Sequence, residues 1–251
     1  MMRLQKFLAN AGITSRRKAE TLIQSGKIEV NGSIVRDLGT KIDENSDTVK
    51  FANRIVKLES DKIYIALNKP TGYISSTDSQ QGKTILDIIK VKNRVYPVGR
   101  LDKDSSGLII LTNDGEFANL ITHARYGCQK EYFVTLDQDL RSEHIKILEK
   151  GMILAGRKLQ PVRVTAAQNK SARMVLSEGL NRQIRRMLGK LGYTVIKLKR
   201  IKIGKLELAD LEPGQWRHIK PENVIWFLIN INLKYDWSIN CYCFLERQKS
   251  T

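Results

Sequence analysis

The chain is poor in cysteine and in acidic residues, and it has no long apolar run. Its three cysteines are an odd number, which gives no disulfide framework and favours a reducing cytoplasm. Cys241 and Cys243 form a Cys-x-Cys pair, but four ligands at zinc spacing are missing, so we expect no metal site. The most apolar stretch, residues 226–233, is far shorter than the roughly 20 residues that span a bilayer. No signal peptide is expected.

Nucleotide-binding signatures and internal repeats are also missing: there is no Gly-rich phosphate loop and no Rossmann fingerprint. What the chain has in excess is positive charge, with 43 Lys and Arg against 26 Asp and Glu, a formal net charge of +17. A polyanion is therefore the expected partner. Its 251 residues are enough for a small domain beside a larger one.

Residues 1–59 have the pattern of one small basic module. Apolar residues at helical spacing predict a helix that begins at Leu4 and ends before Gly12. Ser15 occupies the N-cap position of a second helix, residues 16–24. Asn31-Gly32 then joins two short strands, residues 27–30 and 33–35, as a tight hairpin turn.

The second predicted helix begins with three cations, Arg16, Arg17 and Lys18. The helix dipole disfavours positive charge in the first turn, so their presence there indicates that they face a ligand. The competing interpretation is a charged, solvated helix face.

This module resembles an S4 RNA-binding domain. The resemblance rests on residues 3–6, Ala11-Gly12, residues 15–20, Gly26 and residues 30–32. In such domains the second helix and the turn before the hairpin approach RNA. By resemblance, the RNA contacts are Arg3, Lys6, Ser15, Arg16, Arg17, Lys18 and Asn31. Binding through these cations should weaken with salt, because affinity depends on released counterions.

The most informative stretch is residues 99–115. An apolar run over residues 108–111, bounded by Gly107 and by Asn113-Asp114-Gly115, predicts a buried strand between two turns. Asp102 lies just upstream, where a rigid strand would hold its carboxylate still. Arg100 is two residues earlier and would share a face with Asp102 in an extended segment. Taken alone, such an Arg and Asp are more often a solvated surface pair.

The full string is more specific. Residues 99–102, 106–108 and 111–116 resemble the signature of the RsuA-like group of bacterial ribosomal pseudouridine synthases. The Asp of that motif is catalytic in the family, and the resemblance places it on Asp102. Asp104 and Asp114 do not match it. We expect Asp104 to lie in a solvated turn and Asp114 to cap the helix that begins at Glu116.

Other family motifs follow in order. Lys69-Pro70-x-Gly72 resembles the opening of the catalytic domain, and residues 130–136 resemble the strand that carries an active-site Tyr, here Tyr132. Residues 178–187 resemble the third motif, which places the basic active-site residue on Arg185, in a salt bridge with Asp102. Between residues 181 and 205 there are nine Lys or Arg and no acid, a one-sign face that favours phosphate contact. The predicted RNA contacts there are Arg182 and Arg186, with Arg100 upstream.

The expected protein is α+β: an S4-like domain (residues 1–59), a hinge (60–62), a mixed, largely antiparallel catalytic sheet domain (63–223) and an extension of unassigned role (224–251). The resemblance implies conversion of a specific ribosomal RNA uridine to pseudouridine without metal or cofactor. 23S RNA is favoured over 16S RNA, free or within an assembling subunit. We expect a cytoplasmic monomer with no membrane contact. The alternatives are a non-catalytic RNA-binding or ribosome-assembly protein and an RNA methyltransferase, whose Gly-rich cofactor loop is missing.

Overall fold

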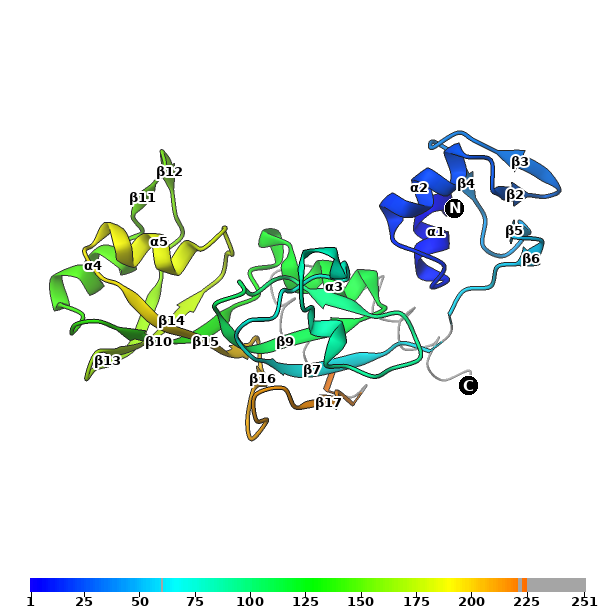
Figure 1. Cartoon of the computed structure of the whole chain (residues 1–251). Coiled ribbons are helices and arrows are strands. Elements are labelled where there is room, and N and C mark those ends of the chain that lie inside the picture. Colours follow the sequence, from blue (N-terminus) through cyan, green and yellow to red (C-terminus); the bar gives the residue numbers. More distant parts are fainter. Residues whose placement is uncertain (60, 221–222, 225–251) are drawn as a thin grey trace. The chain divides into compact units, whose positions relative to one another are not determined.

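A computed structural model describes residues 1–59, 61–220 and 223–224 (Figure 1). The chain divides into two compact units. Unit 1 consists of Met1–Ile63 with the short segments Val91–Tyr96 and Thr112–Gly115, and unit 2 of Tyr64–Lys90, Pro97–Leu111 and Glu116–Thr251. The domain boundaries expected from the sequence stay a prediction. Of the expected extension only Val224 is described, and residues 225–251 lie outside the described residues.

Unit 1 is built on two short helices, α1 (Leu4–Asn10) and α2 (Arg16–Gln24). The side chains of Leu4, Leu8 and Ile23 are fully buried between these helices and the strands that follow. Ser15 caps α2 as the sequence predicts, since its hydroxyl accepts a hydrogen bond from the Lys18 amide at 3.3 Å.

The strands of unit 1 form two small sheets. Strand β1 (Met2–Arg3) pairs with β4 (Lys41–Ile42), and a four-stranded sheet has the order β3 (Ser33–Val35), β2 (Ile28–Val30), β5 (Val49–Phe51), β6 (Arg54–Ile55). Asn31 and Gly32 both have positive φ, 51° and 82°, which is what a tight hairpin turn requires. The predicted hairpin is therefore confirmed.

Unit 2 is organised around one nine-stranded sheet with the order β13-β14-β10-β15-β9-β7-β17, to which β16 and β8 add at β15 and β9. The strands are β7 (Tyr64–Lys69), β8 (Tyr96–Val98), β9 (Ser106–Thr112), β10 (Lys130–Leu136), β13 (Arg163–Gln168), β14 (Ser171–Leu176), β15 (Val195–Ile203), β16 (Leu206–Glu207) and β17 (Trp216–His218). β10 runs antiparallel to β14 and β15, whereas β15 and β9 pair in parallel. The expected mixed, largely antiparallel sheet is confirmed. A separate hairpin pairs β11 (Ile153–Leu154) with β12 (Arg157–Lys158).

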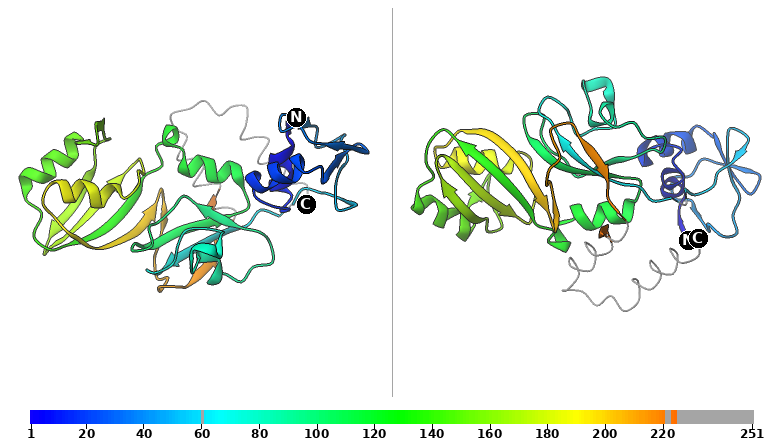
Figure 2. Two further views of the ribbon diagram at one scale, coloured as in Figure 1. Left: turned by 45° about the horizontal axis from the view of Figure 1, so that its top comes forward. Right: turned by 90° about the horizontal axis from the view of Figure 1, so that it is seen from below.

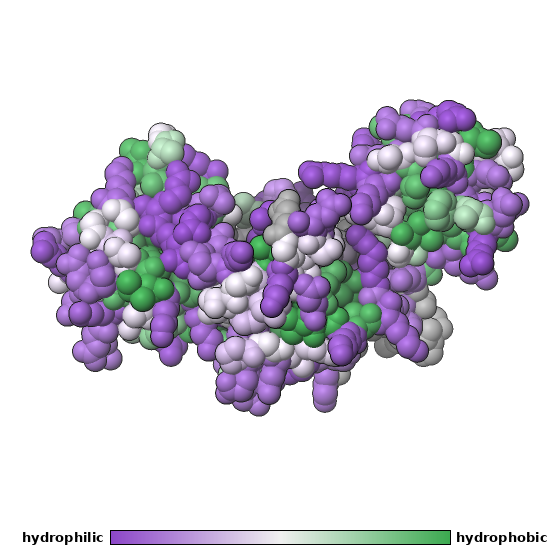
Figure 3. Space-filling model, in the orientation of Figure 1, coloured by the Kyte–Doolittle hydropathy of each residue, from purple (hydrophilic) through white to green (hydrophobic). Residues whose placement is uncertain are grey.

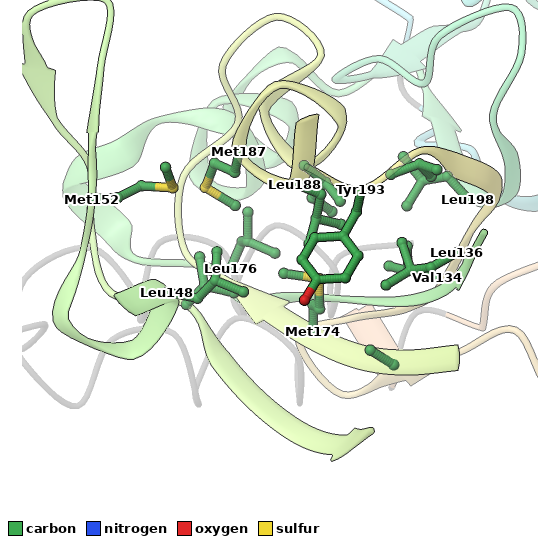
Figure 4. Close-up of a cluster of buried hydrophobic side chains, with 14 of the residues drawn as sticks. Val134, Leu136, Leu148, Met152, Met174, Leu176, Met187, Leu188, Tyr193 and Leu198 are labelled. Atoms are coloured by element: carbon green, nitrogen blue, oxygen red, sulfur yellow. The ribbon is translucent and has the colours of Figure 1, made fainter. Parts of the chain in front are cut away.

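Two helices, α4 (Ser142–Lys150) and α5 (Gln183–Lys190), lie on one side of the sheet (Figures 1 and 2). Their apolar faces pack on β10, β14 and β15 in one buried cluster, where Leu148, Met187 and Leu188 meet Val134 and Met174 (Figure 4). This core fixes the position of α5 relative to the strands, which matters because α5 carries the arginines of the site.

A second core surrounds β9 and the helix α3 (Gly115–Thr122). Residues 108–111 are fully buried, as the sequence predicts for this strand. Residues Ile85–Asp87 form a single 3-10 turn, although the apolar residues between 85 and 89 have helical spacing. This turn is capped: the Thr84 amide donates to the Asp87 carboxylate at 2.7 Å, and the Thr84 hydroxyl accepts from the Leu86 amide at 3.3 Å.

Candidate active site

The loop that carries Asp102 joins β8 to β9 and is fixed at both ends. Before Asp102, the buried hydroxyl of Ser75 accepts a hydrogen bond from the Leu101 amide at 3.0 Å and donates one to the Leu101 carbonyl at 2.9 Å. After it, the Ser105 amide donates to the Asp102 carbonyl at 3.1 Å. The backbone at Asp102 is thus held between a buried clamp and a tight turn, which keeps the carboxylate in one place.

Lys69 lies beneath this loop at the end of β7. Its side chain is completely buried, and its amine donates to the carbonyls of Ser105 at 2.7 Å and Pro70 at 3.0 Å. Burial lowers the pKa of Lys69 to about 8 from its ordinary 10.5; the carboxylates of Asp102 and Asp104 oppose this effect and Arg200 adds to it.

The Asp102 side chain is 31% exposed, and Arg182 Nη1 lies 3.9 Å from its Oδ2. Arg182 precedes α5 and has a left-handed backbone, with φ 49°. At 3.9 Å this is a long ion pair rather than a hydrogen bond. Arg100, which the sequence suggested as the neighbouring cation, is exposed, and the ion pair of Asp102 in the described part of the chain is made by Arg182 instead.

Asp104 binds Arg182 far more closely. Arg182 Nη1 and Nη2 donate to Asp104 Oδ1 and Oδ2 at 3.1 and 2.9 Å, a two-pronged carboxylate pair. Partial burial disfavours the charge on Asp104, but the Arg182 hydrogen bond and the charge of Arg185 outweigh it and hold the Asp104 pKa below its ordinary value. The same hydrogen bond raises the pKa of Arg182. Asp104 lies in an exposed turn, as the sequence predicts, and two arginines of the α5 region converge on it there.

Arg185 is held by the backbone as well as by Asp104. Its Nη1 donates to the Val195 carbonyl at 2.8 Å and its Nη2 to the Asp104 carbonyl at 3.1 Å. Its Nε lies 3.3 Å from Asp104 Oδ2 but is not aligned for a hydrogen bond. The expected salt bridge between Arg185 and Asp102 is therefore wrong for this structure: Arg185 pairs with Asp104, and Arg182 reaches Asp102.

The strand register places Tyr132 in one row with the start of β9. Tyr132 of β10 is the cross-strand partner of Arg200 of β15, and Arg200 is the partner of Gly107 of β9. Gly107 has φ 104°, and a Cβ there would come within 2.6 Å of the Arg200 amide nitrogen. Only glycine allows β9 to approach β15 this closely, five positions after Asp102.

Comparisons with known proteins match both units. Residues 63–190 match the family model described as RNA pseudouridylate synthase, and residues 2–47 match the S4 domain. The chain belongs to the RNA pseudouridine synthase family.

Relatives of this synthase resemble it over most of its length. The ribosomal large subunit pseudouridine synthase B of Bacillus subtilis is 40% identical over 232 residues, which cover 89% of this chain and 94% of that protein. The dual-specificity RNA pseudouridine synthase RluF of Escherichia coli K12 is 37% identical over 226 residues, 89% of this chain and 77% of that protein. A crystal structure of a pseudouridylate synthase superposes with a TM-score of 0.68 at 30% identity, covering 90% of this chain and 100% of that one.

The predicted RNA contacts of the synthase have different local roles. Arg16, Arg17 and Lys18 are exposed on α2, whereas Ser15 is used as the helix cap. The amide of Asn31 donates to Asp47 at 2.8 Å and accepts from the Thr48 backbone at 2.9 Å, so it holds the hairpin in place. The remaining candidates are distributed over both units: Arg3 and Lys6 in unit 1, and Arg100, Arg182 and Arg186 in unit 2.

Three residues of the site were not identified from the sequence. Lys69 belongs to a recognised motif, but the motif gave it no role. No sequence pattern marked Ser75. Asp104 looked like an ordinary loop carboxylate. Each acts through a partner 26 or more positions away, which no local pattern records.

The described residues include no group of three or more His, Cys, Asp or Glu that could hold a metal ion. No helix in the described ranges is long and apolar enough to cross a membrane. In Figure 3 hydrophilic side chains crowd the surface over α5, the helix that contains Arg185 and Arg186.

Proposed function

We propose that this synthase converts a specific uridine of ribosomal RNA to pseudouridine, with 23S RNA as the first candidate and 16S RNA as the second. The similarity to a large-subunit enzyme of Bacillus subtilis supports 23S RNA. The net charge of +17 suits a large polyanion. The S4 domain gives a second, separate region for RNA contact.

The placement of Asp102 supports this function above all. The reaction is an isomerisation: the bond between C1′ and N1 breaks, a bond between C1′ and C5 forms, and the C5 proton leaves as N1 gains one. No external reactant is consumed. Asp102 starts the reaction either by attacking C1′ or by removing a ribose proton, and both routes need a carboxylate held still beside the sugar. The clamp of Ser75 on Leu101 provides that rigidity.

A uridine in folded RNA must first leave its stack, because its neighbours screen the glycosidic carbon; flipping costs about a few kcal/mol. Arg100 is exposed on the same loop as Asp102, two residues before it. We assign to Arg100 the role of filling the vacated position or holding the flipped backbone.

Tyr132 and Arg185 complete the proposed catalytic set. The phenol ring of Tyr132 stacks on the uracil, and its oxygen is available for a late proton transfer. Arg185 is only 13% exposed and is tied to the Asp104 carbonyl, so we assign it the role of holding the Asp102 loop against α5. Arg182 supplies the cation nearest to the Asp102 carboxylate.

RNA contact outside the reacting nucleotide is assigned to the cations of the two units. Arg3, Lys6, Arg16, Arg17 and Lys18 belong to the S4 unit, and Arg186 is exposed on α5. These contacts are to phosphates, so binding should weaken steeply as salt rises.

The test is pseudouridine mapping on 23S and 16S transcripts, and on partly assembled subunits, with the wild type and Asp102→Asn. Asn keeps size and polarity but removes the charge. We expect one new pseudouridine with the wild type and a rate loss of at least about a thousandfold with Asp102→Asn, while RNA binding changes less than about threefold. Asp210→Asn is the matched control, because Asp210 is 89% exposed and pairs with Arg217 on the surface of the same unit.

Equal modification by wild type and Asp102→Asn would remove Asp102 from the mechanism. A new pseudouridine in 16S RNA alone would make 16S RNA the substrate in place of 23S RNA and would leave the proposed activity standing. Binding without modification of either RNA, free or in subunits, would contradict ribosomal RNA as the substrate.

A further inference from the structure

The sheet of unit 2 has a second side, away from the helices α4 and α5. Side chains alternate along a strand, so Val134 and Met174 point into the helix-covered core while their neighbours Phe133 and Arg173 point to the other side. The right view of Figure 2 is taken from that side. We call it the open face, and its central residues are Ser171, Arg173, Phe133, Thr135, Lys197 and Lys199.

Phe133 lies at the centre of a row that crosses three strands. Arg173 of β14 and Lys199 of β15 are its direct cross-strand partners. Residues in such positions have Cβ atoms about 5 Å apart, so both cations lie beside the ring. Phe133 is 38% exposed and the Arg173 side chain 53%. The row therefore presents an accessible aromatic surface between two positive charges.

The next row along the strands is polar and contains a third cation. Thr135 is the cross-strand partner of Ser171 on one side and of Lys197 on the other. Lys197 is exposed, and the two hydroxyl residues are partly exposed. Hydroxyl groups and lysines are donors that suit phosphate and ribose oxygens. Two successive rows of the open face thus combine cations, hydroxyls and an aromatic ring.

The carboxylates beside these rows leave most of the positive charge unneutralised. Glu131 is 20% exposed and lies 3.5 Å from Arg173, and Glu207 lies 2.7 Å from Lys202. Among the described residues, no carboxylate lies within ion-pair distance of Lys197 or Lys199. The pair of Arg173 with Glu131 is a surface pair, which a phosphate can replace at little cost. A solvated surface usually mixes both signs of charge, so this one-sign set favours a polyanion.

We propose that the open face binds a single-stranded segment of RNA, with one base stacked on Phe133 and the adjoining phosphates on Arg173 and Lys199. The inference rests on the proposed function in one respect, that the bound segment belongs to the substrate RNA. It adds a surface on the side of the sheet away from Tyr132, whose ring packs toward the helix-covered core.

The exposed ring is the reason for choosing single-stranded RNA. A base within a duplex is covered by its neighbours, whereas an unpaired base offers both faces for stacking on an aromatic side chain. Aromatic stacking combined with cations along the backbone is the general means by which proteins hold single strands. An acidic protein partner would use the cations and leave the ring without a role.

The first test observes Phe133 itself, in the full chain labelled with 4-fluorophenylalanine. The fluorine resonance of Phe133 is assigned by its loss in Phe133→Leu. The probe is an oligocytidine RNA of about eight nucleotides, a length typical of such sites, which contains no uridine for the catalytic centre. We expect the resonance to shift with this RNA and to stay nearly unchanged with inorganic polyphosphate, which has the charge and no bases.

Equal shifts with both probes would show a surface that reads charge alone and would overturn the stacking. No shift with the RNA would overturn the proposal entirely. Neither result depends on finding a modified uridine, so the proposed function is judged separately.

The same resonance, titrated with the RNA at several salt concentrations, measures the affinity of the open face. Arg173→Gln and Lys199→Gln should each weaken binding about threefold and reduce the slope of log affinity against log salt by about 0.7, because each removes one phosphate contact. The control is Lys146→Gln, since Lys146 is an exposed cation of α4 on the other side of the sheet. If Lys146→Gln weakens binding as much as the other two, the attraction is general and the proposal fails.

Activity then shows whether the bound segment is part of the substrate. On the RNA that the wild type modifies, Phe133→Leu should raise KM about three- to tenfold and leave kcat within about twofold, because the open face binds RNA away from the reacting nucleotide. Phe133→Tyr keeps the ring and should behave as the wild type. Ile147→Ala is the control, because Ile147 is an exposed apolar residue of α4, 42% exposed. An unchanged KM in Phe133→Leu, or a loss of kcat alone, contradicts substrate binding at the open face.

Discussion

Replacing Lys69 by methionine removes the buried amine beneath the Asp102 loop while keeping a long, flexible side chain. The amine is completely buried and bonds the carbonyls of Ser105 and Pro70. Its folded-state pKa of about 8 is well below the ordinary 10.5. The folded protein therefore binds the proton of this amine more weakly than the unfolded chain does.

The free energy of unfolding depends on pH because the folded and unfolded states bind the proton of Lys69 with different affinity. Below pH 8 the amine is charged in both states, and the folded state bears the whole cost of burying that charge. Between pH 8 and 10.5 the folded state loses the proton first, so the free energy of unfolding rises with pH. A shift of 2.5 units, 10.5 minus 8, corresponds to about 3 kcal/mol at roughly 1.4 kcal/mol per unit.

The assay is urea unfolding at several pH values between 7.5 and 10.5, followed by tryptophan fluorescence. Trp216 lies in β17 of unit 2, so its fluorescence reports on that unit. Lys69→Met leaves two carbonyls without a donor, but that loss does not vary with pH. The wild type should gain about 3 kcal/mol over Lys69→Met across the range.

Lys158→Met is the matched control, because Lys158 is an exposed lysine of β12 in the same unit. Its difference from the wild type should stay level with pH. If the Lys69→Met difference is level too, within about 0.5 kcal/mol, burial does not lower the pKa of this amine.

Two further predictions concern the backbone. Gly107→Ala should destabilise unit 2 by at least about 3 kcal/mol, because φ is 104° and the new Cβ would press on the Arg200 backbone; Gly189→Ala in α5, with open space around it, should cost nothing. Urea unfolding followed by tryptophan fluorescence measures both, and equal stabilities would refute the close approach. Ser15→Ala should speed amide exchange over residues 16–24 about fivefold, since losing an N-cap costs about 1 kcal/mol; exposed Ser33→Ala should not, and unchanged exchange in Ser15→Ala would mean that the cap contributes nothing.

Much of the fold could be predicted because its signals are local. The Ser15 cap, the Asn31-Gly32 turn and the apolar run of β9 depend on residues close together in the sequence, and each has the predicted structure. Residues 85–89 have apolar residues at helical spacing, yet Thr84 and Asp87 close a capped 3-10 turn there. A few residues at one spacing cannot distinguish a single turn from a helix.

The site could be predicted only where a whole motif marked it. Asp102 is proposed from its string, and its neighbours could not be predicted in the same way: the sequence suggested Arg185 and the structure places Arg182 beside it. Arg182 and Arg185 lie less than one helical turn apart, so sequence spacing cannot tell which one a carboxylate will meet. That choice depends on the left-handed backbone at Arg182 and on the anchoring of Arg185 to Val195, both set by tertiary packing.

The strand order of the sheet has a consequence for how the protein is made. The core of the S4 module uses residues between Leu4 and Val56, so this module can fold as soon as its own chain has left the ribosome. Asp102 cannot meet its arginines until α5 has been synthesised, and β7 gains its partner β17 only when residues 216–218 emerge. A nascent chain therefore passes through a stage in which its S4 module is folded and its catalytic centre is not yet assembled.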